Sequence, residues 1–573
     1  MAVGFKNRTT PGVYITELDA FPPSIVGVQT AVPAFIGYTE KAEINGKQSF
    51  NKPIRVGSMA DFEEYFGKQY QPQYDIVAAP ISSPPDYKYD FRVAVTNQSS
   101  PPVSPMPPSG WDYFYLKQVS ASKFNLYDSM RLFYANGGGN CYVVSVGDYS
   151  KAISLTDLNG GLNVIAGQVG PTMLVIPDAV LLPPKTSSDA TASVGTGDKP
   201  VPPYVEPTEV STDFQNLVYA MLKQCANLQD RIAILDVYNT LSVVDDNTLN
   251  TTIQNFHSDV ADEHLNYGMA YFPFLVTSVV QATDFDFTNF TSDGLSTLQK
   301  ILYWETENLY PLPKTTSPPD PNSKHELLRG YINGLPALST QYNATPTDPT
   351  VQASIKTTNQ NLSMALPLYG KIVQIMVDMN SVLPPSAAMA GVYTYIDGTR
   401  GVWNAPANID LTGVVQTTYK LSDPQQGELN VPVDGKAVNA IREFIGRGSV
   451  VWGARTLDGN SNDWKYIQVR RTLIYVEQSI KLALNQFVFA ANDANTWATV
   501  VAMVSNFLGN LWAQGGLMGD KATDAFTVQC GLGSTMTGMD ILSGYMVVQV
   551  TLQMIHPAEF IELTFKQQMQ GVS

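Results

Sequence analysis

The sequence predicts a large multidomain protein of mixed α/β and α+β class. Its 573 residues, 44% of them apolar, make about four domains' worth of chain and can bury a large core. Short apolar runs alternate with helically spaced segments in the first half, which is typical of a partly parallel sheet covered by helices. The last third changes to two long helical patterns followed by strands of period two.

The first half contains the buried strands of the expected α/β layer. Residues 141–146 (CYVVSV) and 172–178 (TMLVIPD) are short apolar runs closed by turn residues, which favours strands covered on both faces. Residues 214–229 carry apolar side chains at helical spacing and run into a third candidate strand, 231–237 (RIAILDV). A helix followed directly by a strand indicates a parallel crossover unit.

Proline-rich and polar stretches separate these elements. Residues 101–110 (PPVSPMPPSG) cannot form a helix or a sheet interior, because proline removes donors and fixes φ. Residues 182–207 are expected to be a long exposed loop, and residues 310–324 and 343–350 further surface insertions.

Two helices are expected in the last third, over residues 470–490 and 496–516, the second ending at a glycine pair suited to a C-cap. Residues 545–554 and 560–566 then alternate with a period of two, so each has one apolar face. The apolar side chains that this period aligns are Val548, Val550, Leu552, Ile561, Leu563 and Phe565.

Strand-prone segments at both ends of the sequence have two possible partners. Residues 12–18 (GVYITEL) form a short candidate strand before the break at Pro22 and Pro23, and residues 545–566 form the other. A strand with unpaired edges pairs either within its own domain or with another chain. Composition alone leaves both alternatives open, closure of the protein's own sheet or donation to a neighbour.

Charge and composition exclude several classes of function. The chain has 35 Lys and Arg against 51 Asp and Glu, a net charge of −16, which argues against binding to nucleic acid or to an anionic membrane. Only 15% of residues are charged, against about 25% in ordinary soluble domains. Charges are depleted in interface cores, so this deficit indicates a surface covered by other subunits.

Targeting signals are not expected. The first residues lack the apolar region of a signal peptide, which predicts synthesis in the cytoplasm. The longest weakly polar stretch, residues 267–280, is 14 residues long, short of the about 20 that a membrane-spanning helix needs. Cys141, Cys225 and Cys530 lack a CxxC spacing and are expected to be buried free thiols.

Enzyme signatures are weak, and we predict no catalytic, cofactor-binding or metal residues. A serine hydrolase needs a base held against its nucleophile, yet none of the four histidines has such a setting. Ser534, in GLGSTMTG, only superficially resembles a nucleophile turn. Residues 262–264 (DEH) lack the HExxH spacing for zinc, and residues 136–140 (NGGGN) lack the GK[ST] ending of a phosphate loop.

Several blocks closely resemble contractile tail sheath proteins of bacteriophages and related contractile injection systems. The first is TPGVYITELDAFPPSIVGVQTAVPAFIGYTEKA, at residues 10–42. Further blocks follow in family order, at residues 130–147, 230–237, 383–408, 446–457, 463–480 and 556–565. The proline-rich insertions depart from the family pattern.

The resemblance implies a structural protein without enzymatic activity or cofactor, part of an assembled phage tail or injection particle. Such subunits form stacked hexameric rings, wound as a helix around an inner tube, and contract to drive that tube through a target envelope. The implied partners are further copies of the chain, the inner tube protein, and baseplate and terminal cap proteins, with no nucleic acid and no membrane insertion. The alternative is a degenerate or active subtilisin-like hydrolase, because the middle of tail sheaths resembles the α/β layout of subtilisin.

The resemblance also implies a domain order. It comprises an N-terminal strand-donating arm (1–24), an outer region with a proline-rich insertion (25–170), a subtilisin-like α/β domain (171–420) with insertions at 182–207 and 310–350, an inner tube-facing assembly domain (421–544) and a strand-donating tail (545–573). The arm and the tail are expected to add strands to sheets of adjacent subunits. The residues expected to pair between subunits are Val13, Tyr14, Ile15, Val548, Val550, Leu552, Ile561, Leu563 and Phe565.

A basic window lies in the expected inner domain. Residues 442–481 contain seven basic and four acidic side chains, in a chain that is acidic elsewhere. Arg470, Arg471 and Lys481 are therefore predicted to face the tube. An ordinary solvated face with internal ion pairs is the alternative.

Overall fold

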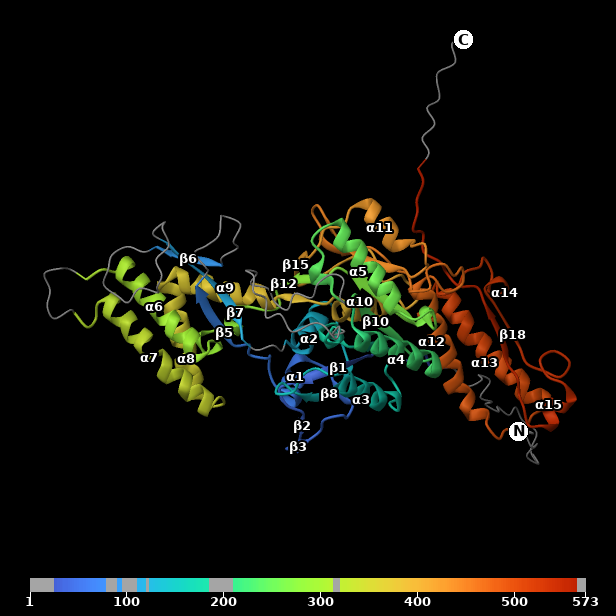
Figure 1. The fold of residues 1–573 in the computed structure, drawn as a ribbon. Coiled ribbons are helices and arrows are strands. Elements are labelled where there is room, and N and C mark those ends of the chain that lie inside the picture. The colour runs from blue at the N-terminus through green and yellow to red at the C-terminus, as the bar shows by residue number, and fades with distance from the viewer. Residues whose placement is uncertain are drawn as a thin grey trace, which may run out of the picture. The chain divides into compact units, whose positions relative to one another are not determined.

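The computed structural model describes residues 25–78, 90–94, 111–119, 123–184, 210–312 and 320–563. The chain forms two compact units, unit 1 (Met1–Val28 with Thr472–Ser573) and unit 2 (Gln29–Arg471). Figure 1 shows helices and strands alternating through most of the chain, so the predicted mixed α/β class is confirmed. Val13, Tyr14, Ile15 and Phe565 lie outside the described residues, as do most of residues 182–207.

Unit 2 is built on a nine-stranded sheet. In spatial order its strands are β14 (Ile409–Asp410), β17 (Gly448–Val451), β16 (Val438–Phe444), β11 (Gly268–Phe272), β10 (Ile232–Asp236), β9 (Met173–Val175), β1 (Pro33–Thr39), β8 (Cys141–Asp148) and β4 (Ile54–Val56). The strands from β16 to β8 are parallel, whereas β14, β17 and β4 pair antiparallel at the two edges. The expected strands at 141–146, 172–178 and 231–237 are thus confirmed as β8, β9 and β10.

Helices cover both faces of this sheet. We call the sheet and the helices around it the sheet lobe of unit 2. Its helices are α1 (Met59–Phe66), α2 (Leu126–Ala135), α3 (Leu155–Ala166), α4 (Thr212–Leu228), α5 (Asp246–Asp259), α10 (Ser386–Thr399) and α11 (Asp423–Asn430). Phe35 of β1 packs on Phe133 of α2, while its neighbour Ile36 lies against Gly161 of α3. Successive side chains of a strand point to opposite faces, so α2 and α3 lie on opposite sides of the sheet.

A second, helical lobe of unit 2 has its own apolar core. Its antiparallel sheet has the order β5 (Tyr74–Ala78), β7 (Trp111–Gln118), β6 (Phe91–Ala94). Its helices are α6 (Ser292–Leu309), α7 (Lys324–Ala344), α8 (Pro349–Ala365) and α9 (Pro367–Asn380). Buried Leu298, Ile332, Leu362 and Tyr369, one from each helix, meet in one cluster. Smaller pairings complete the unit: β2 (Glu43–Ile44) with β3 (Lys47–Gln48), and β12 (Leu275–Thr277) between β13 (Val382–Leu383) and β15 (Val414–Thr417).

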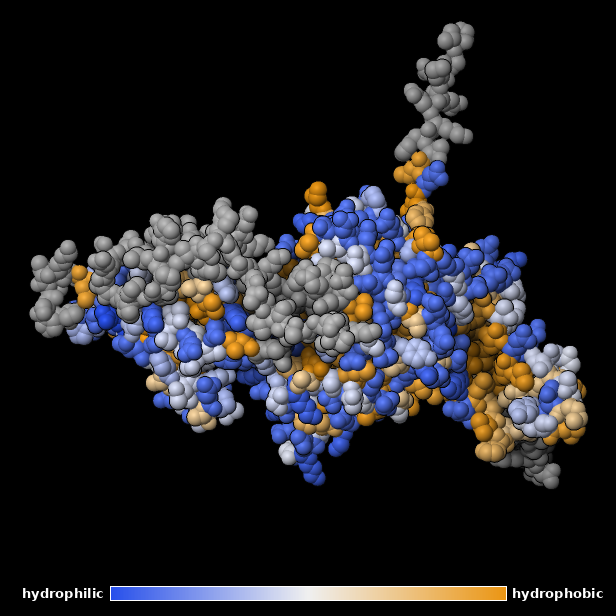
Figure 2. Space-filling view, in the orientation of Figure 1, coloured by the Kyte–Doolittle hydropathy of each residue, from blue (hydrophilic) through white to orange (hydrophobic). Residues whose placement is uncertain are grey.

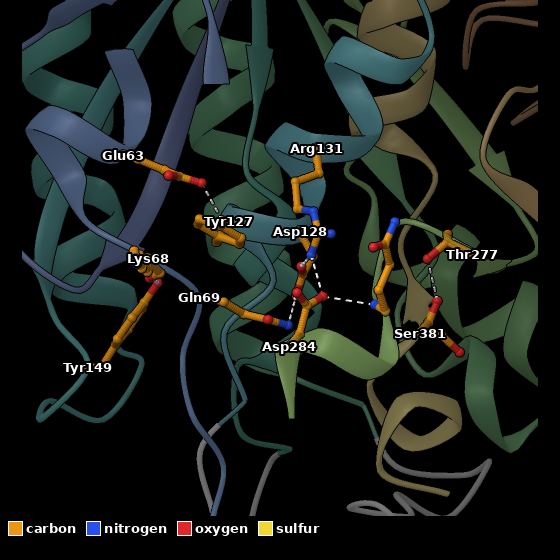
Figure 3. Close-up of polar contacts among 11 residues, drawn as sticks. Glu63, Lys68, Gln69, Tyr127, Asp128, Arg131, Tyr149, Thr277, Asp284 and Ser381 are labelled. Atoms are coloured by element: carbon orange, nitrogen blue, oxygen red, sulfur yellow. Dashed lines mark hydrogen bonds and ion pairs between the residues drawn. The ribbon is translucent and has the colours of Figure 1, made fainter. Parts of the chain in front are cut away.

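A polar network lies where the chain passes between the sheet and the helical lobe (Figure 3). Arg131 of α2 bonds to Asp284, which precedes α6, with Nη1 to Oδ2 at 2.7 Å, and to Asp128 at 3.4 Å. Gln69, on the connection from α1 to β5, donates to Asp128 at 2.8 Å. Burial raises the pKa of Asp128 to about 6. These contacts tie helix α2 and two connections between the lobes into one polar cluster.

The structure divides the chain differently from the predicted domain order. The boundaries at 170/171 and 420/421 cut through the nine-stranded sheet, because strands from all three predicted domains pair within it. The supposed insertion at 310–350 contains helix α7, whose Leu328, Ile332 and Leu335 are buried in the helical lobe. Stretches rich in proline and threonine flank α7 on both sides, and such stretches are typical of surface loops.

Unit 1 contains most of α12 (Ile467–Leu484), with α13 (Ala494–Ala513), α14 (Ala522–Ala525), β18 (Phe526–Gln529), α15 (Gly538–Leu542) and β19 (Gln549–Leu552). The two long helices expected at 470–490 and 496–516 are confirmed as α12 and α13. In the part of the chain that the structure describes, no helix has both the length and the apolar character to cross a membrane.

Candidate assembly interface

The centre of the candidate interface is the two-stranded antiparallel sheet of unit 1. Val528 of β18 lies opposite Val550 of β19, and Phe526 lies opposite Leu552. These four side chains are half-buried on the face toward α13, whereas Thr527, Gln529, Gln549 and Thr551 are exposed. The period of two in residues 545–554 therefore reflects packing on α13.

This pairing gives Val550 and Leu552 a partner within their own chain, in β18. It leaves the other edge of β19 open, so pairing of these residues between subunits stays a prediction. Val548 lies just before β19. Sequence reasoning missed β18 altogether. The alternation of FTVQ was visible, but it is four residues long and adjoins helix α14.

Both outer edges of the sheet offer unused backbone groups. The backbone N–H of Gln553 donates to the carbonyl oxygen of Ala525 at 2.8 Å. This bond shows which residue pairs of β18 and β19 are hydrogen-bonded to each other. In an antiparallel pair, hydrogen-bonded and non-hydrogen-bonded residue pairs alternate. Val528 and Val550 therefore form a non-hydrogen-bonded pair, and their N–H and C=O groups point outward. Within the described residues, β18 and β19 are the only members of this sheet.

The segment after β19 exposes apolar side chains. Phe560, Ile561 and Leu563 are each at least 74% exposed, and the described residues up to 563 form no strand there. Figure 1 shows this stretch as an extended trace beyond β19. Three large apolar side chains in water within four residues favour a partner that covers them.

A second apolar surface of unit 1 joins the end of α12 to α15. Val488, Phe489, Met539, Leu542 and Tyr545 are all exposed, and Figure 2 shows apolar side chains gathered at this end of the unit. A hydrogen bond joins the two segments. Asn492 Nδ2 donates to the backbone carbonyl oxygen of Tyr545 at 2.9 Å.

Phe489 combines two uncommon properties. Its φ is +67°, in the left-handed region that bulky residues avoid, and its side chain is fully exposed. Backbone strain of this kind is concentrated at functional sites. This supports a contact role for the loop between α12 and α13.

The structure places the three predicted tube-facing residues in two different environments. Arg470 and Arg471 are each 4% exposed, so neither guanidinium reaches the surface. Arg470 stacks over the ring of Tyr267 at 4.0 Å, and Arg471 forms an ion pair with Asp397 at 2.6 Å. Lys481, a few turns later on α12, is exposed.

The other arginines of residues 442–481 also form ion pairs or are buried within unit 2. Arg442 pairs with Asp423 at 2.7 Å and Arg447 with Asp410 at 2.6 Å, and Arg455 is buried. The described residues of unit 1, 472–563, contain seven acidic residues and two lysines. A charge count along the sequence cannot distinguish a basic surface from buried or paired arginines.

Residues of the kinds that carry catalysis have structural partners. His257 lies 2.7 Å from Asp434, and burial lowers the pKa of this histidine. Ser534 Oγ donates to Gly531 O within its own turn at 3.1 Å. Cys141 and Cys225 are buried free thiols, and burial raises the pKa of Cys141 to about 12. Among the described residues, no cluster of three or more His, Cys, Asp or Glu side chains could hold a metal ion.

A comparison with protein families found a match in the region that contains the β18–β19 sheet. The family model described as the phage tail sheath C-terminal domain matches residues 460–568. Residues 460–568 are therefore similar to the phage tail sheath C-terminal domain. The matched region includes α12, α13, β18 and β19, and therefore both open sheet edges.

Curated relatives and a solved structure agree with this match. The tail sheath protein of Burkholderia phage BcepMu is 25% identical over 179 residues, 30% of this chain and 37% of that protein. The tail sheath protein of Vibrio phage KVP40 is 24% identical over 140 residues, 24% of this chain and 21% of that protein. The chain thus spans well under half the length of these two relatives, and the resemblance to contractile tail sheath proteins is confirmed.

The likeness in fold extends over almost the whole chain. The sheath complex of an extracellular contractile injection system, called PVC and solved in the contracted state, covers 98% of this chain and 99% of its own. The TM-score is 0.53 at 24% identity, so the shared property is the fold.

Proposed function

We propose that this protein is a structural sheath subunit that polymerises as stacked hexameric rings in a helical tube around an inner tube. On contraction, the sheath drives the inner tube through a target envelope. The observation that carries the proposal is the β18–β19 sheet, which lies within the region similar to the sheath C-terminal domain and is open at both edges. The fold likeness to a contracted sheath complex supports it.

Assembly proceeds by strand addition. One strand from a neighbour pairs with the outward N–H and C=O of Val528, and another pairs with those of Val550. Main-chain hydrogen bonds supply affinity and the alternating side chains fix the register. The donors are residues 12–18 and residues 560–566 of other subunits, since both segments are strand-prone and the second alternates with a period of two.

Contraction needs no nucleotide in this proposal. The extended sheath is metastable, and the contracted sheath buries more surface between subunit bodies, so the released free energy drives the movement. The added strands keep neighbours attached while the bodies repack. Exposed apolar side chains such as Phe489 and Leu542 supply surface to be buried.

The α/β lobe of unit 2 is proposed to be the outer, subtilisin-like domain of the subunit. Six parallel strands with helices on both faces support that assignment. Inner tube, baseplate and terminal cap proteins are the proposed partners, in a phage tail or an injection particle. Lys481 is the member of the predicted tube-facing set that remains available, because it is exposed.

The first experiment is negative-stain electron microscopy of the expressed chain. We expect hollow tubes built from rings. Compact monomers with peptidase activity would instead support the hydrolase alternative.

Val528→Pro tests the open edge directly. The substitution removes an outward N–H that the chain's own ladder does not use, and proline is tolerated at such edge positions. We expect a folded chain with unchanged circular dichroism and no tubes. Val528→Thr, which keeps the N–H and the branched shape, is the matched control and should form tubes. Normal tubes from the proline variant would contradict strand addition at β18.

A further inference from the structure

The two units are joined by two peptide connections, one between Val28 and Gln29 and one between Arg471 and Thr472. The second connection lies inside helix α12, which begins in unit 2 and ends in unit 1. These two peptide connections are the covalent links between the units. The side chains that hold them are therefore of mechanical interest.

Arg471 holds both connections at their unit 2 ends. Its Nη1 and Nη2 donate to Oδ1 and Oδ2 of Asp397 in α10 at 2.9 and 2.6 Å, a two-point ion pair. Nη2 also donates to the carbonyl oxygen of Thr30 at 3.4 Å, one residue beyond the other connection. One guanidinium thus binds α12, through its own backbone, and the N-terminal segment to the same helix.

The ion pair is buried and its surroundings are held by further contacts. Both side chains are 4% exposed, and the guanidinium lies 4.6 Å from the centre of the Tyr393 ring in α10. The Tyr393 hydroxyl is 2.7 Å from that of Tyr271, in strand β11. The Thr30 carbonyl accepts a second bond, from Thr172 Oγ1 at 2.7 Å. The pair is therefore fastened to the central sheet as well as to α10.

The same two segments also contact each other within unit 1. Val28 N donates to Ser479 Oγ of α12 at 3.1 Å, and Ser479 is completely buried. A side chain at Gly27 would collide with the ring of Tyr475, so the segment lies close against the helix. The N-terminal segment and α12 are therefore hydrogen-bonded to each other both in unit 1, through Val28 and Ser479, and at the start of unit 2, through Thr30 and Arg471.

We propose that Arg471, held by Asp397, is a positioning residue that clamps both connections between the units and so transmits force between them. The part concerning force rests on the proposed sheath function. The part concerning the clamp does not, because it concerns the single chain. Arginine suits the task since its planar fork satisfies a carboxylate at two points and a carbonyl at once.

The test is hydrogen exchange followed by mass spectrometry on the unassembled full-length chain. Arg471→Met combined with Asp397→Leu removes the ion pair without leaving an unpaired buried charge. We expect exchange to become at least about tenfold faster in peptides covering residues 25–32 and 467–480, and unchanged elsewhere. Arg442→Met with Asp423→Leu removes an exposed ion pair of the same unit and should leave both regions as in the wild type.

Two results would overturn the clamp. Faster exchange in 467–480 alone would mean that Arg471 holds only its own helix. Faster exchange throughout unit 2 would mean that the pair merely supports the fold. Arg471→Lys, which keeps the charge but loses the two-point geometry, should give an intermediate effect in both peptides. None of these outcomes depends on tube formation, so failure of the sheath proposal would be seen separately, in the microscope.

Discussion

Two buried aspartates hold the helices of the sheet lobe at the level of single residues. Asp178 follows β9 and accepts hydrogen bonds from the backbone N–H of Tyr38 at 3.1 Å and of Asn125, before α2, at 2.7 Å. Asp236 ends β10 and accepts one from Ser386, at the start of α10, at 2.7 Å. Burial raises the pKa of Asp178 to about 6 and that of Asp236 to about 7.

These shifts predict a pH dependence with a definite sign. An aspartate in an unfolded chain has a pKa of about 3.9, so the folded chain binds the proton of Asp236 more tightly. Its contribution to stability is full below pH about 4 and is lost as the pH rises through about 7. The wild-type Tm should therefore fall between pH 5 and pH 8.

Asp236→Asn should flatten this dependence, because the amide keeps an acceptor for Ser386 and carries no charge. We expect a gain of up to about 4 kcal/mol in the unfolding free energy at pH 8, at about 1.4 kcal/mol per pKa unit. Thermal melts of both proteins across this pH range are the measurement. Parallel curves would show that Asp236 does not titrate in this range.

The burial of single charged residues could not be predicted from this sequence. The basic character of Arg470 and Arg471 was evident, but their partners Tyr267 and Asp397 lie far away along the chain. No local pattern indicates that a guanidinium meets an aromatic ring or a carboxylate from another helix. Burial of a charged side chain is decided by such distant contacts.

At the level of elements, the apolar periodicity showed which face of a strand or helix is covered. It did not show which element covers that face. Strands β8, β9 and β10 and helices α4, α12 and α13 follow from apolar spacing, because each buries one face or both. The period of two in residues 545–554 was equally clear. It shows that Val550 and Leu552 share a covered face, and it does not show whether the covering element belongs to the same chain.

The tail beyond β19 gives a prediction at this level. Exchanging Ile561 with Glu562 and Leu563 with Thr564 keeps the composition and moves the apolar side chains to the other face. Because a shift of one position reverses every side chain of a strand, tube yield should fall at least about tenfold. Sedimentation of assembled material is the measurement. The control is Ile561→Val, which keeps an apolar side chain on the same face and should assemble normally.

At the level of the whole molecule, the two units should unfold separately. Unit 1 is the smaller and exposes many of the large apolar side chains, including Phe489, Leu542 and Ile561. We expect two calorimetric transitions for the unassembled chain, with unit 1 at the lower temperature. Assembly should raise that first transition by about 10 °C or more, because binding stabilises only the folded unit. A single transition that assembly leaves unchanged would contradict this.

The low charge content can now be placed in the molecule. The described residues 472–563 of unit 1 carry few charges, and this part of the chain also exposes many large apolar side chains. Some charged residues of the sheet lobe, such as Arg471 and Asp236, are buried and add nothing to its surface. The contrast between the units could not be derived from the total of −16, since composition carries no position.

The contact between Val28 and Ser479 has a consequence for synthesis. The two residues are 451 positions apart, so the ribosome releases Val28 long before Ser479 exists. During that interval unit 2 can fold as its strands emerge, whereas unit 1 cannot. Unit 1 is thus completed last. If it carries the assembly surface, as proposed, growing chains on one messenger RNA cannot pair through that surface before it has folded.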